Sequence, residues 1–433
     1  MFDRKAYQER IKWFQEARLG LFIHWGLYSI PARGEWIRSY ERMTVEDYQQ
    51  YFDEFDPVDF DPKAWAKAAR QAGMRYAVFT AKHHDGFCLF DSKHTEYKAT
   101  NTKAGRDLVK EYVEAFRAEG LKVGLYFSII DWYHPDFPAF GDRQHPMRDN
   151  PDYRGKKHDL DNYLRHMHAQ VEELVTGYGQ IDLLWFDFSY ENMTGETWRA
   201  TDLVRMVRKH QPQVLINNRL EVSGEGFGSL LEENPSEFSG DFVSPEQIVP
   251  PHGVVDYRGD PVAWEACITM NNNWCFHATD RFHKPARMLI RKLVECVSKG
   301  GNMLLNVGPT ARGEFPPESL QILEEIGRWM HLNHDSIYGC GIAGIPKPDF
   351  GRVTRKGDTL YYHVFDNPIG YLPLLGVKAD DIKAVRLLAT GHELPIQRNW
   401  ITDNYPDIPF VSFGPDPILP DETDTVVAVK LKD

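Results

Sequence analysis

Residues 19–24 read Leu-Gly-Leu-Phe-Ile-His, an almost continuous apolar run of the kind found in buried parallel strands. Five later runs share this character: 75–80 (RYAVFT), 121–128 (LKVGLYFS), 181–187 (IDLLWFD), 214–217 (VLIN) and 302–307 (NMLLNV). We therefore predict a buried strand at each of these positions.

Amphipathic helices are predicted between the strands, at 62–73, 107–119, 160–177, 197–210 and 285–298. In the third of these, apolar residues recur at a period close to 3.6, at Leu164, Val171, Leu174 and Val175. Strands that alternate with helices over this length form a parallel sheet, and six or more favour an α/β fold of the (β/α)8-like (TIM-type) barrel class. The competing doubly wound sheet is less favoured, because no G-x-G-x-x-G sequence follows a strand.

The character of the chain changes after a further predicted helix at 318–333. From about residue 342, prolines and glycines separate short strand-like runs, at 359–365, 382–388 and 425–431. Such runs are typical of a small β-sandwich. We expect a barrel-like domain at 1–340, followed by a C-terminal β-sandwich domain at 341–433.

Composition excludes several classes of protein. The 433 residues are 42% apolar and 26% charged, which excludes a disordered, collagen-like or small disulfide-stabilised chain. The net charge of -13 argues against nucleic acid and anionic membranes as partners. The sequence contains neither an 18-residue apolar run nor the apolar core of a signal peptide, so we expect a cytoplasmic protein unless a leader has been removed.

The cysteines point to free buried thiols. Their number is odd and C-x-x-C spacing is absent, which argues against a disulfide framework and against a zinc-thiolate site. They are Cys88, Cys267, Cys275, Cys296 and Cys340.

In a barrel of this kind the active site lies at the carboxyl ends of the strands. The predicted strand ends carry histidine, tryptophan, tyrosine, carboxylate and arginine side chains, at His24-Trp25, 82–85 (KHHD), Tyr126, Asp187 and Arg219. Such a set suits a sugar, because hydroxyls need directional polar partners and the apolar face of a sugar ring stacks on aromatic rings.

Two features of these strand ends leave alternatives open. Asp187 ends an apolar strand, where an unpaired charge is costly, so it is either used in chemistry or paired by Arg219 or a backbone turn. His83 and His84 point to opposite faces unless the strand has already ended. Together with Asp85 they suggest a metal site, but no H-E-x-x-H or H-x-H at a strand end supports one, so we predict no metal.

Four segments carry a resemblance to a known family: 20–31 (GLFIHWGLYSIP), 82–92 (KHHDGFCLFDS), 181–187 and 297–309 (VSKGGNMLLNVGP). These segments closely resemble α-L-fucosidases of glycoside hydrolase family 29. The likeness runs in consistent order from about residue 10 to residue 340. The resemblance implies a barrel with a C-terminal β-sandwich and an exo-acting enzyme on a fucosylated glycan or glycoside. It also implies retaining hydrolysis of terminal α-L-fucose without metal or cofactor.

Retaining hydrolysis needs two carboxyl groups about 5–5.5 Å apart. By the resemblance, Asp187 is the nucleophile that forms a covalent fucosyl-enzyme, although Phe188 follows it where W-F-D-G is the commoner motif. Glu246 lies in S-P-E-Q, which resembles the stretch that carries the acid/base in one branch of the family. Glu265 is the second candidate for the acid/base, and a helix-start role for Glu246 stays open.

The remaining roles also follow from the resemblance. Hydroxyl ligands of the fucose are expected at His24, His83 and His84, with Tyr126 and Arg219 beside them. Aromatic walls are expected at Trp36 and Trp274, and packing in the core is the alternative for each.

Three other functions stay open at this point. One is a retaining glycosidase of the same fold on a related sugar, such as an α-L-galactoside, and another is a catalytically silent carbohydrate-binding relative. The third is a metal-dependent hydrolase that uses His83, His84 and Asp85. By its resemblance to one branch of the family, the S-P-E-Q stretch implies a preference for α-1,3/1,4-linked fucose. The sequence leaves a homo-oligomer open.

Overall fold

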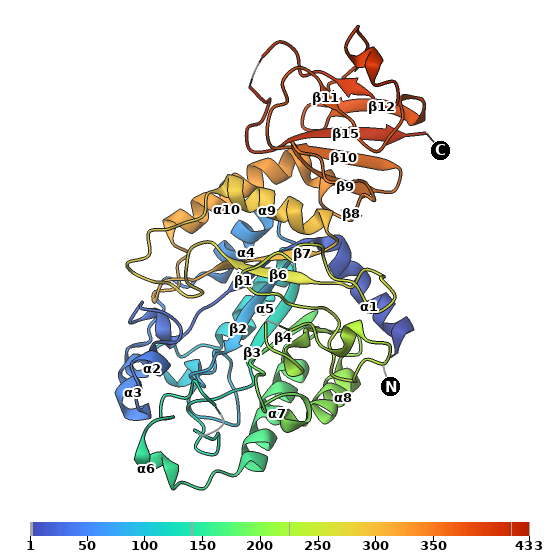
Figure 1. Cartoon of the computed structure of the whole chain (residues 1–433). Coiled ribbons are helices and arrows are strands. Elements are labelled where there is room, and N and C mark those ends of the chain that lie inside the picture. The colour runs from blue at the N-terminus through green and yellow to red at the C-terminus, as the bar shows by residue number, and fades with distance from the viewer. Residues whose placement is uncertain (1–2, 140–141, 225, 417, 433) are drawn as a thin grey trace.

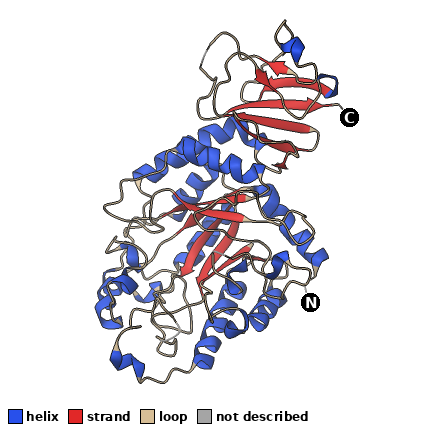
Figure 2. Cartoon of the chain, in the orientation of Figure 1, coloured by secondary structure: helices blue, strands red, loops and turns tan. Residues whose placement is uncertain are grey.

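A computed structural model describes residues 3–139, 142–224, 226–416 and 418–432. Seven parallel strands form its central sheet in the order β5-β4-β3-β2-β1-β7-β6, with helices around them (Figure 2). The strands are β1 (Leu19–Ile23), β2 (Tyr76–Lys82), β3 (Lys122–Ser128), β4 (Leu183–Asp187), β5 (Leu215–Ile216), β6 (Glu265–Thr269) and β7 (Asn302–Val307). All six predicted strands are present, and β6 is an addition that the sequence analysis did not predict.

The extended segment 242–246 lies between β5 and β6 and takes the place of an eighth strand. Parallel backbone bridges join Asn217 to Phe242 on one side and Glu246 to Cys267 on the other. Phe242 is also buried in the same cluster as the interior side chains of the strands. The predicted barrel class is therefore confirmed, and the irregular segment 242–246 closes the barrel.

The helices around the barrel are mostly those expected. The predicted ones are α4 (Pro62–Gln71), α5 (Leu108–Ala118), α7 (Leu160–Gly177), α8 (Ala200–His210), α9 (Ala286–Ser298) and α10 (Pro317–Asn333). The sequence analysis missed α1 (Arg4–Ala17), α2 (Ile37–Tyr40), α3 (Val45–Glu54) and α6 (Pro151–Arg154). Of these, α3 carries a readable signal, a capping box between Thr44 and Asp47. Within the described ranges, no helix combines the length and apolarity needed to cross a membrane.

Two antiparallel sheets form the C-terminal β-sandwich, which confirms the predicted fold. One has the order β12-β15-β10-β9-β8 and the other β11-β14-β13. Their strands are β8 (Gly341–Ile342), β9 (Gly351–Lys356), β10 (Thr359–Val364), β11 (Leu372–Pro373), β12 (Ile382–Leu387), β13 (Ile396–Gln397), β14 (Phe410–Val411) and β15 (Thr425–Leu431). Along β10, Leu360 and Tyr362 face the sandwich core while Tyr361 packs with the barrel cluster.

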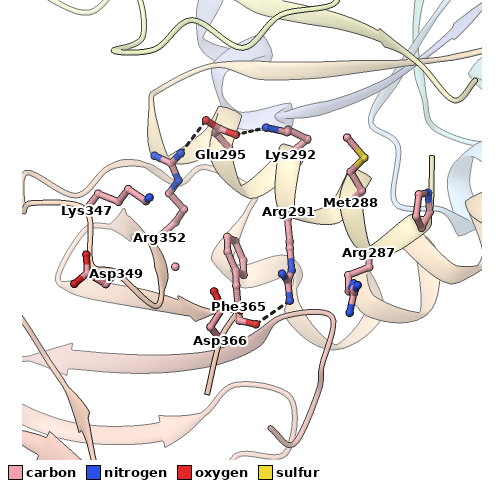
Figure 3. Close-up of a pocket in the computed structure, with 12 residues that line it drawn as sticks. Arg287, Met288, Arg291, Lys292, Glu295, Lys347, Asp349, Arg352, Phe365 and Asp366 are labelled. Atoms are coloured by element: carbon pink, nitrogen blue, oxygen red, sulfur yellow. Dashed lines mark hydrogen bonds and ion pairs between the residues drawn. The ribbon is translucent and has the colours of Figure 1, made fainter. Parts of the chain in front are cut away.

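The sandwich stacks on α9 and α10 (Figure 1) and is tied to α9 by charged side chains around a cavity of about 430 Å³. Glu295 of α9 pairs with Arg352 of β9 at 2.8 Å and with Lys292 at 2.8 Å (Figure 3). Arg291 donates to the carbonyl oxygen of Phe365 at 2.8 Å. These charged side chains join the sandwich to the barrel.

Candidate active site

Asp187 is the last residue of β4, at the carboxyl end of the barrel. Its carboxylate accepts hydrogen bonds from the Tyr126 hydroxyl at 2.8 Å and from Nη1 of Arg219 at 3.0 Å. Burial raises the pKa of Asp187 to about 6, and the Arg219 charge opposes that rise. The carboxylate is thus ionised at neutral pH and held by two donors.

Arg219 connects Asp187 to the Glu246 carboxylate. Its guanidinium is 3% exposed and is fixed by Ser244, whose hydroxyl and carbonyl oxygens accept from Nε at 2.9 Å and Nη2 at 3.0 Å. Nη2 also donates to Oε2 of Glu246 at 3.1 Å, and the guanidinium lies over the Trp185 ring at 4.7 Å. The planar Arg219 guanidinium bonds both carboxylates. The distance between them is therefore compatible with the separation of about 5–5.5 Å that a retaining pair needs.

Glu246 lies on the closing segment 242–246, and its side chain is 39% exposed. The next regular element among the described residues is β6, so the alternative that Glu246 begins a helix is wrong. An acid at this position is open to a leaving group from solvent. The closing segment is thus the element that brings Glu246 to the carboxyl end of the barrel.

Glu265 lies elsewhere, at the first residue of β6 and hence at the amino end of the barrel. Its two oxygens accept hydrogen bonds from the Tyr76 hydroxyl and, at 3.2 Å, from Nε1 of Trp185. The side chain is fully buried, and burial raises its pKa to about 7. Since a strand rises about 3.3 Å per residue, Glu265 lies roughly 13 Å below the far end of β6. This position favours Glu246 over Glu265 as the acid/base.

The three histidines follow the ends of β1 and β2 and gather beside Asp187. Nδ1 of His24 bonds Oδ1 of Asn306 at 2.6 Å, and Nδ1 of His84 bonds the Ser128 hydroxyl at 2.7 Å. Nε2 of His84 lies 3.9 Å from Asp187, while Nδ1 of His83 is buried and lacks a hydrogen-bond partner among the described residues. Burial lowers the pKa of His24 to about 3 and those of His83 and His84 well below the usual value.

His83 and His84 share one site because β2 has already ended at Lys82. Their ring centroids lie 4.1 Å apart, and the His83 ring stacks on Tyr126 at 5.5 Å. Asp85 turns away, and its oxygens accept from the Tyr48 hydroxyl and the Phe87 amide, each at 3.1 Å. In the part of the chain that the structure describes, no group of three or more histidine, cysteine or acidic residues is arranged to hold a metal ion.

The two predicted aromatic walls both border the histidines and are half-buried. The Trp36 ring lies 5.0 Å from that of His84, and the Trp274 ring lies 5.1 Å from that of His24. Asn306 fixes this side of the site, since its amide nitrogen donates to the carbonyl oxygen of Trp274 at 2.6 Å. Each tryptophan therefore borders the histidine cluster beside Asp187.

Glu35, next to Trp36, is a candidate site residue that the sequence analysis missed. Its carboxylate accepts from the amide of Cys275 at 3.5 Å, and burial raises its pKa, with a further contribution from the Glu246 charge. Its position directly before Trp36, a predicted aromatic wall, was the available signal.

An outer pocket of about 740 Å³ opens beside Glu246. Its lining includes Arg143, Phe188, Tyr190, Arg219, Glu246 and Gln247. The carboxylates thus lie between the enclosed histidine cluster and this open pocket.

Comparisons with known proteins agree with this geometry. The tissue alpha-L-fucosidase of Mus musculus is 29% identical over 387 residues, which cover 84% of this chain and 77% of that protein. The structure of alpha-L-fucosidase isoenzyme 1 from Paenibacillus thiaminolyticus is 59% identical, with a TM-score of 0.96 over 99% of this chain and 100% of that one.

A second structure bears on the chemistry of relatives. The GH29 alpha-L-fucosidase of Bacteroides thetaiotaomicron, trapped as a covalent intermediate with 2-fluoro-fucosyl fluoride, is 30% identical. Its TM-score is 0.83, and the match covers 98% of this chain and 96% of that one. The family model for alpha-L-fucosidase matches residues 2–335, and the chain therefore belongs to the α-L-fucosidases of glycoside hydrolase family 29.

Proposed function

We propose that this protein is a retaining exo-α-L-fucosidase that releases terminal α-L-fucose from fucosylated glycans or glycosides, with Asp187 as nucleophile and Glu246 as acid/base. The observation that carries the assignment is Arg219, a buried guanidinium that bonds both carboxylates from one fixed position. Membership of the family and the covalent intermediate of the Bacteroides relative support the same chemistry.

In the first step, an oxygen of Asp187 attacks the anomeric carbon of fucose. The bond between that carbon and the leaving-group oxygen breaks, and Glu246 gives its proton to that oxygen. In the second step, Glu246 takes a proton from water, whose oxygen attacks the same carbon and frees Asp187. Two inversions return α-L-fucose, and the two half-reactions consume only one water.

The histidines are proposed to bind the fucose hydroxyls. Because burial lowers the pKa of His24, His83 and His84, they are neutral at pH 7 and each ring offers one donor and one acceptor. Trp36 and Trp274 supply the apolar walls for the ring and its methyl group.

Azide rescue tests the two carboxylate roles. With an aryl α-L-fucoside, Asp187→Ala abolishes turnover, and added azide restores it with β-fucosyl azide as product. Glu246→Ala is rescued with α-fucosyl azide as product, because azide then attacks the fucosyl-enzyme. Glu265→Gln serves as the control and gives no fucosyl azide. Full activity in Asp187→Ala would refute the proposal.

The finer specificity is also a proposal. The S-P-E-Q sequence around Glu246 supports α-1,3/1,4-linked fucose, and comparing kcat/KM for α-1,2- with α-1,3-linked trisaccharides tests it. The α-L-galactoside and the catalytically silent alternatives are less favoured, because the matched relatives are α-L-fucosidases and both carboxylates are present. A cytoplasmic location and self-association stay predictions of the sequence.

A further inference from the structure

Phe188 has a backbone conformation that side chains rarely adopt. It follows Asp187 directly, and its φ is +111°, in the region that favours glycine. A strained conformation persists only where the surrounding structure holds it. Glycine is also the residue that the commoner W-F-D-G motif has at this point, so the chain carries a large ring where the backbone favours none.

The chain is held on both sides of Phe188. The carbonyl oxygen of Asp187 accepts from the amide of Ile129 at 2.8 Å. The Ser189 hydroxyl donates to the carbonyl oxygen of Leu220 at 3.1 Å and accepts from Nε1 of Trp198 at 3.0 Å. The backbone at Phe188 is thus held by contacts of the residues on either side of it.

This backbone turns the Phe188 ring into the site. In a regular strand, residue 188 points away from the face on which Asp187 lies. Instead, the Phe188 ring lies 5.3 Å from Trp36, 5.1 Å from His84 and 4.7 Å from Tyr190. It also lines the outer pocket beside Glu246. One ring therefore borders both the fucose position and the pocket next to the acid/base.

We propose that Phe188 is a specificity-determining residue whose ring is the wall shared by the fucose site and the outer pocket, and that it stacks on the apolar face of a leaving-group sugar. The proposal rests on the proposed fucosidase function. The polar rim of the pocket includes Arg143, whose guanidinium has more donors than its bond to Glu191 uses and can bond a hydroxyl at the edge of that sugar.

Fucosyl fluoride separates the two sides of this wall, because its leaving group is a single atom that needs no outer pocket. The ratio of kcat/KM for a fucosylated trisaccharide to kcat/KM for α-L-fucosyl fluoride isolates the leaving-group contacts. We expect this ratio to fall at least tenfold in Phe188→Ala and Phe188→Gly. Phe188→Tyr keeps the ring and serves as the matched control, with a ratio within threefold of wild type.

A ratio unchanged in both small variants would overturn this inference while the proposed function stands. Failure of wild type to hydrolyse fucosyl fluoride, together with no labelling of Asp187 by 2-fluoro-fucosyl fluoride, would overturn both. If the Ala variant does not fold, Phe188→Leu replaces it, since its side chain fills part of the same space without a flat face.

A second comparison tests the backbone argument alone. Phe188→Gly and Phe188→Ala both lack the ring and differ only by one methyl group. At an ordinary φ the alanine variant is the more stable, but at +111° the order reverses. We therefore expect the glycine variant to have the higher Tm, and a higher Tm for alanine would contradict the assigned strain.

Discussion

Replacing Tyr126 by phenylalanine removes one hydroxyl from the site and leaves the ring in place. That hydroxyl belongs to a buried side chain and donates to Oδ2 of Asp187 at 2.8 Å. The hydrogen bond favours the ionised carboxylate, so its loss raises the pKa of Asp187 above the wild-type value of about 6. Since only ionised Asp187 attacks fucose in the proposed mechanism, the acid limb of kcat/KM moves to higher pH.

The size of the effect follows from the bond that is lost. A hydrogen bond to a charged group is worth about 1.5–3 kcal/mol, which corresponds to a displacement of the acid limb by at least about one pH unit. With a displacement of that size, the fraction of ionised Asp187 falls about fivefold at pH 6, about twofold at pH 7 and hardly at all at pH 8. The loss of activity therefore shrinks as the pH rises.

The assay is kcat/KM for an aryl α-L-fucoside between pH 5 and pH 9, for wild type and Tyr126→Phe. Tyr112→Phe is the matched control, because its buried hydroxyl donates to the carbonyl oxygens of Ala77 and Gly124, away from Asp187. We expect the control to keep the wild-type acid limb. An acid limb that stays in place or moves to lower pH in Tyr126→Phe would refute the reasoning.

Three further predictions concern a buried acid, the bridging arginine and metal. Because Glu265 has a pKa of about 7 in the folded state, the native protein keeps a proton that the unfolded chain releases above about pH 4.5. The unfolding free energy of wild type should therefore fall by roughly 3 kcal/mol relative to Glu265→Gln between pH 4 and pH 8, measured by urea denaturation, and a constant difference would contradict this. Arg219→Lys should lower kcat/KM by about 10- to 100-fold, because a point charge replaces a fork that bonds two carboxylates, and a loss below threefold would argue against the bridging role. Incubation with EDTA should leave kcat unchanged, whereas a loss that added Zn²⁺ or Mg²⁺ reverses would show a metal-dependent step.

The regular part of the fold was predictable because its signals are local. Apolar runs such as 181–187 and the 3.6-residue period in α7 report burial directly, and the structure has a strand and a helix there. The closing segment 242–246 has no such signal, since it is short, contains Pro245 and pairs only through isolated bridges. Its place in the barrel is decided by pairing with the strands on either side. Local sequence patterns carry no information about that pairing.

The candidate site residues also divide into those that local sequence signals reveal and those that they do not. Asp187 and the three histidines were found because they end or follow strands, and every such position lies at one edge of the barrel. Glu246 was placed ahead of Glu265 only by its resemblance to the family, because both lie in segments whose distance from that edge was unknown. The structure separates them by depth: one is exposed beside Arg219, and the other is buried between Tyr76 and Trp185.

The position of Arg219 explains how one fixed cation serves both halves of the proposed reaction. Before the first step the negative charge lies on Asp187, which Nη1 contacts, while Glu246 holds the proton. After that step Asp187 is a neutral ester, and the charge lies on Glu246, which Nη2 contacts. The charge thus passes between two carboxylates that share one guanidinium, and Ser244 keeps that guanidinium still. A donor that need not move at either stage is preorganised, which is the form of electrostatic stabilisation that lowers a barrier most.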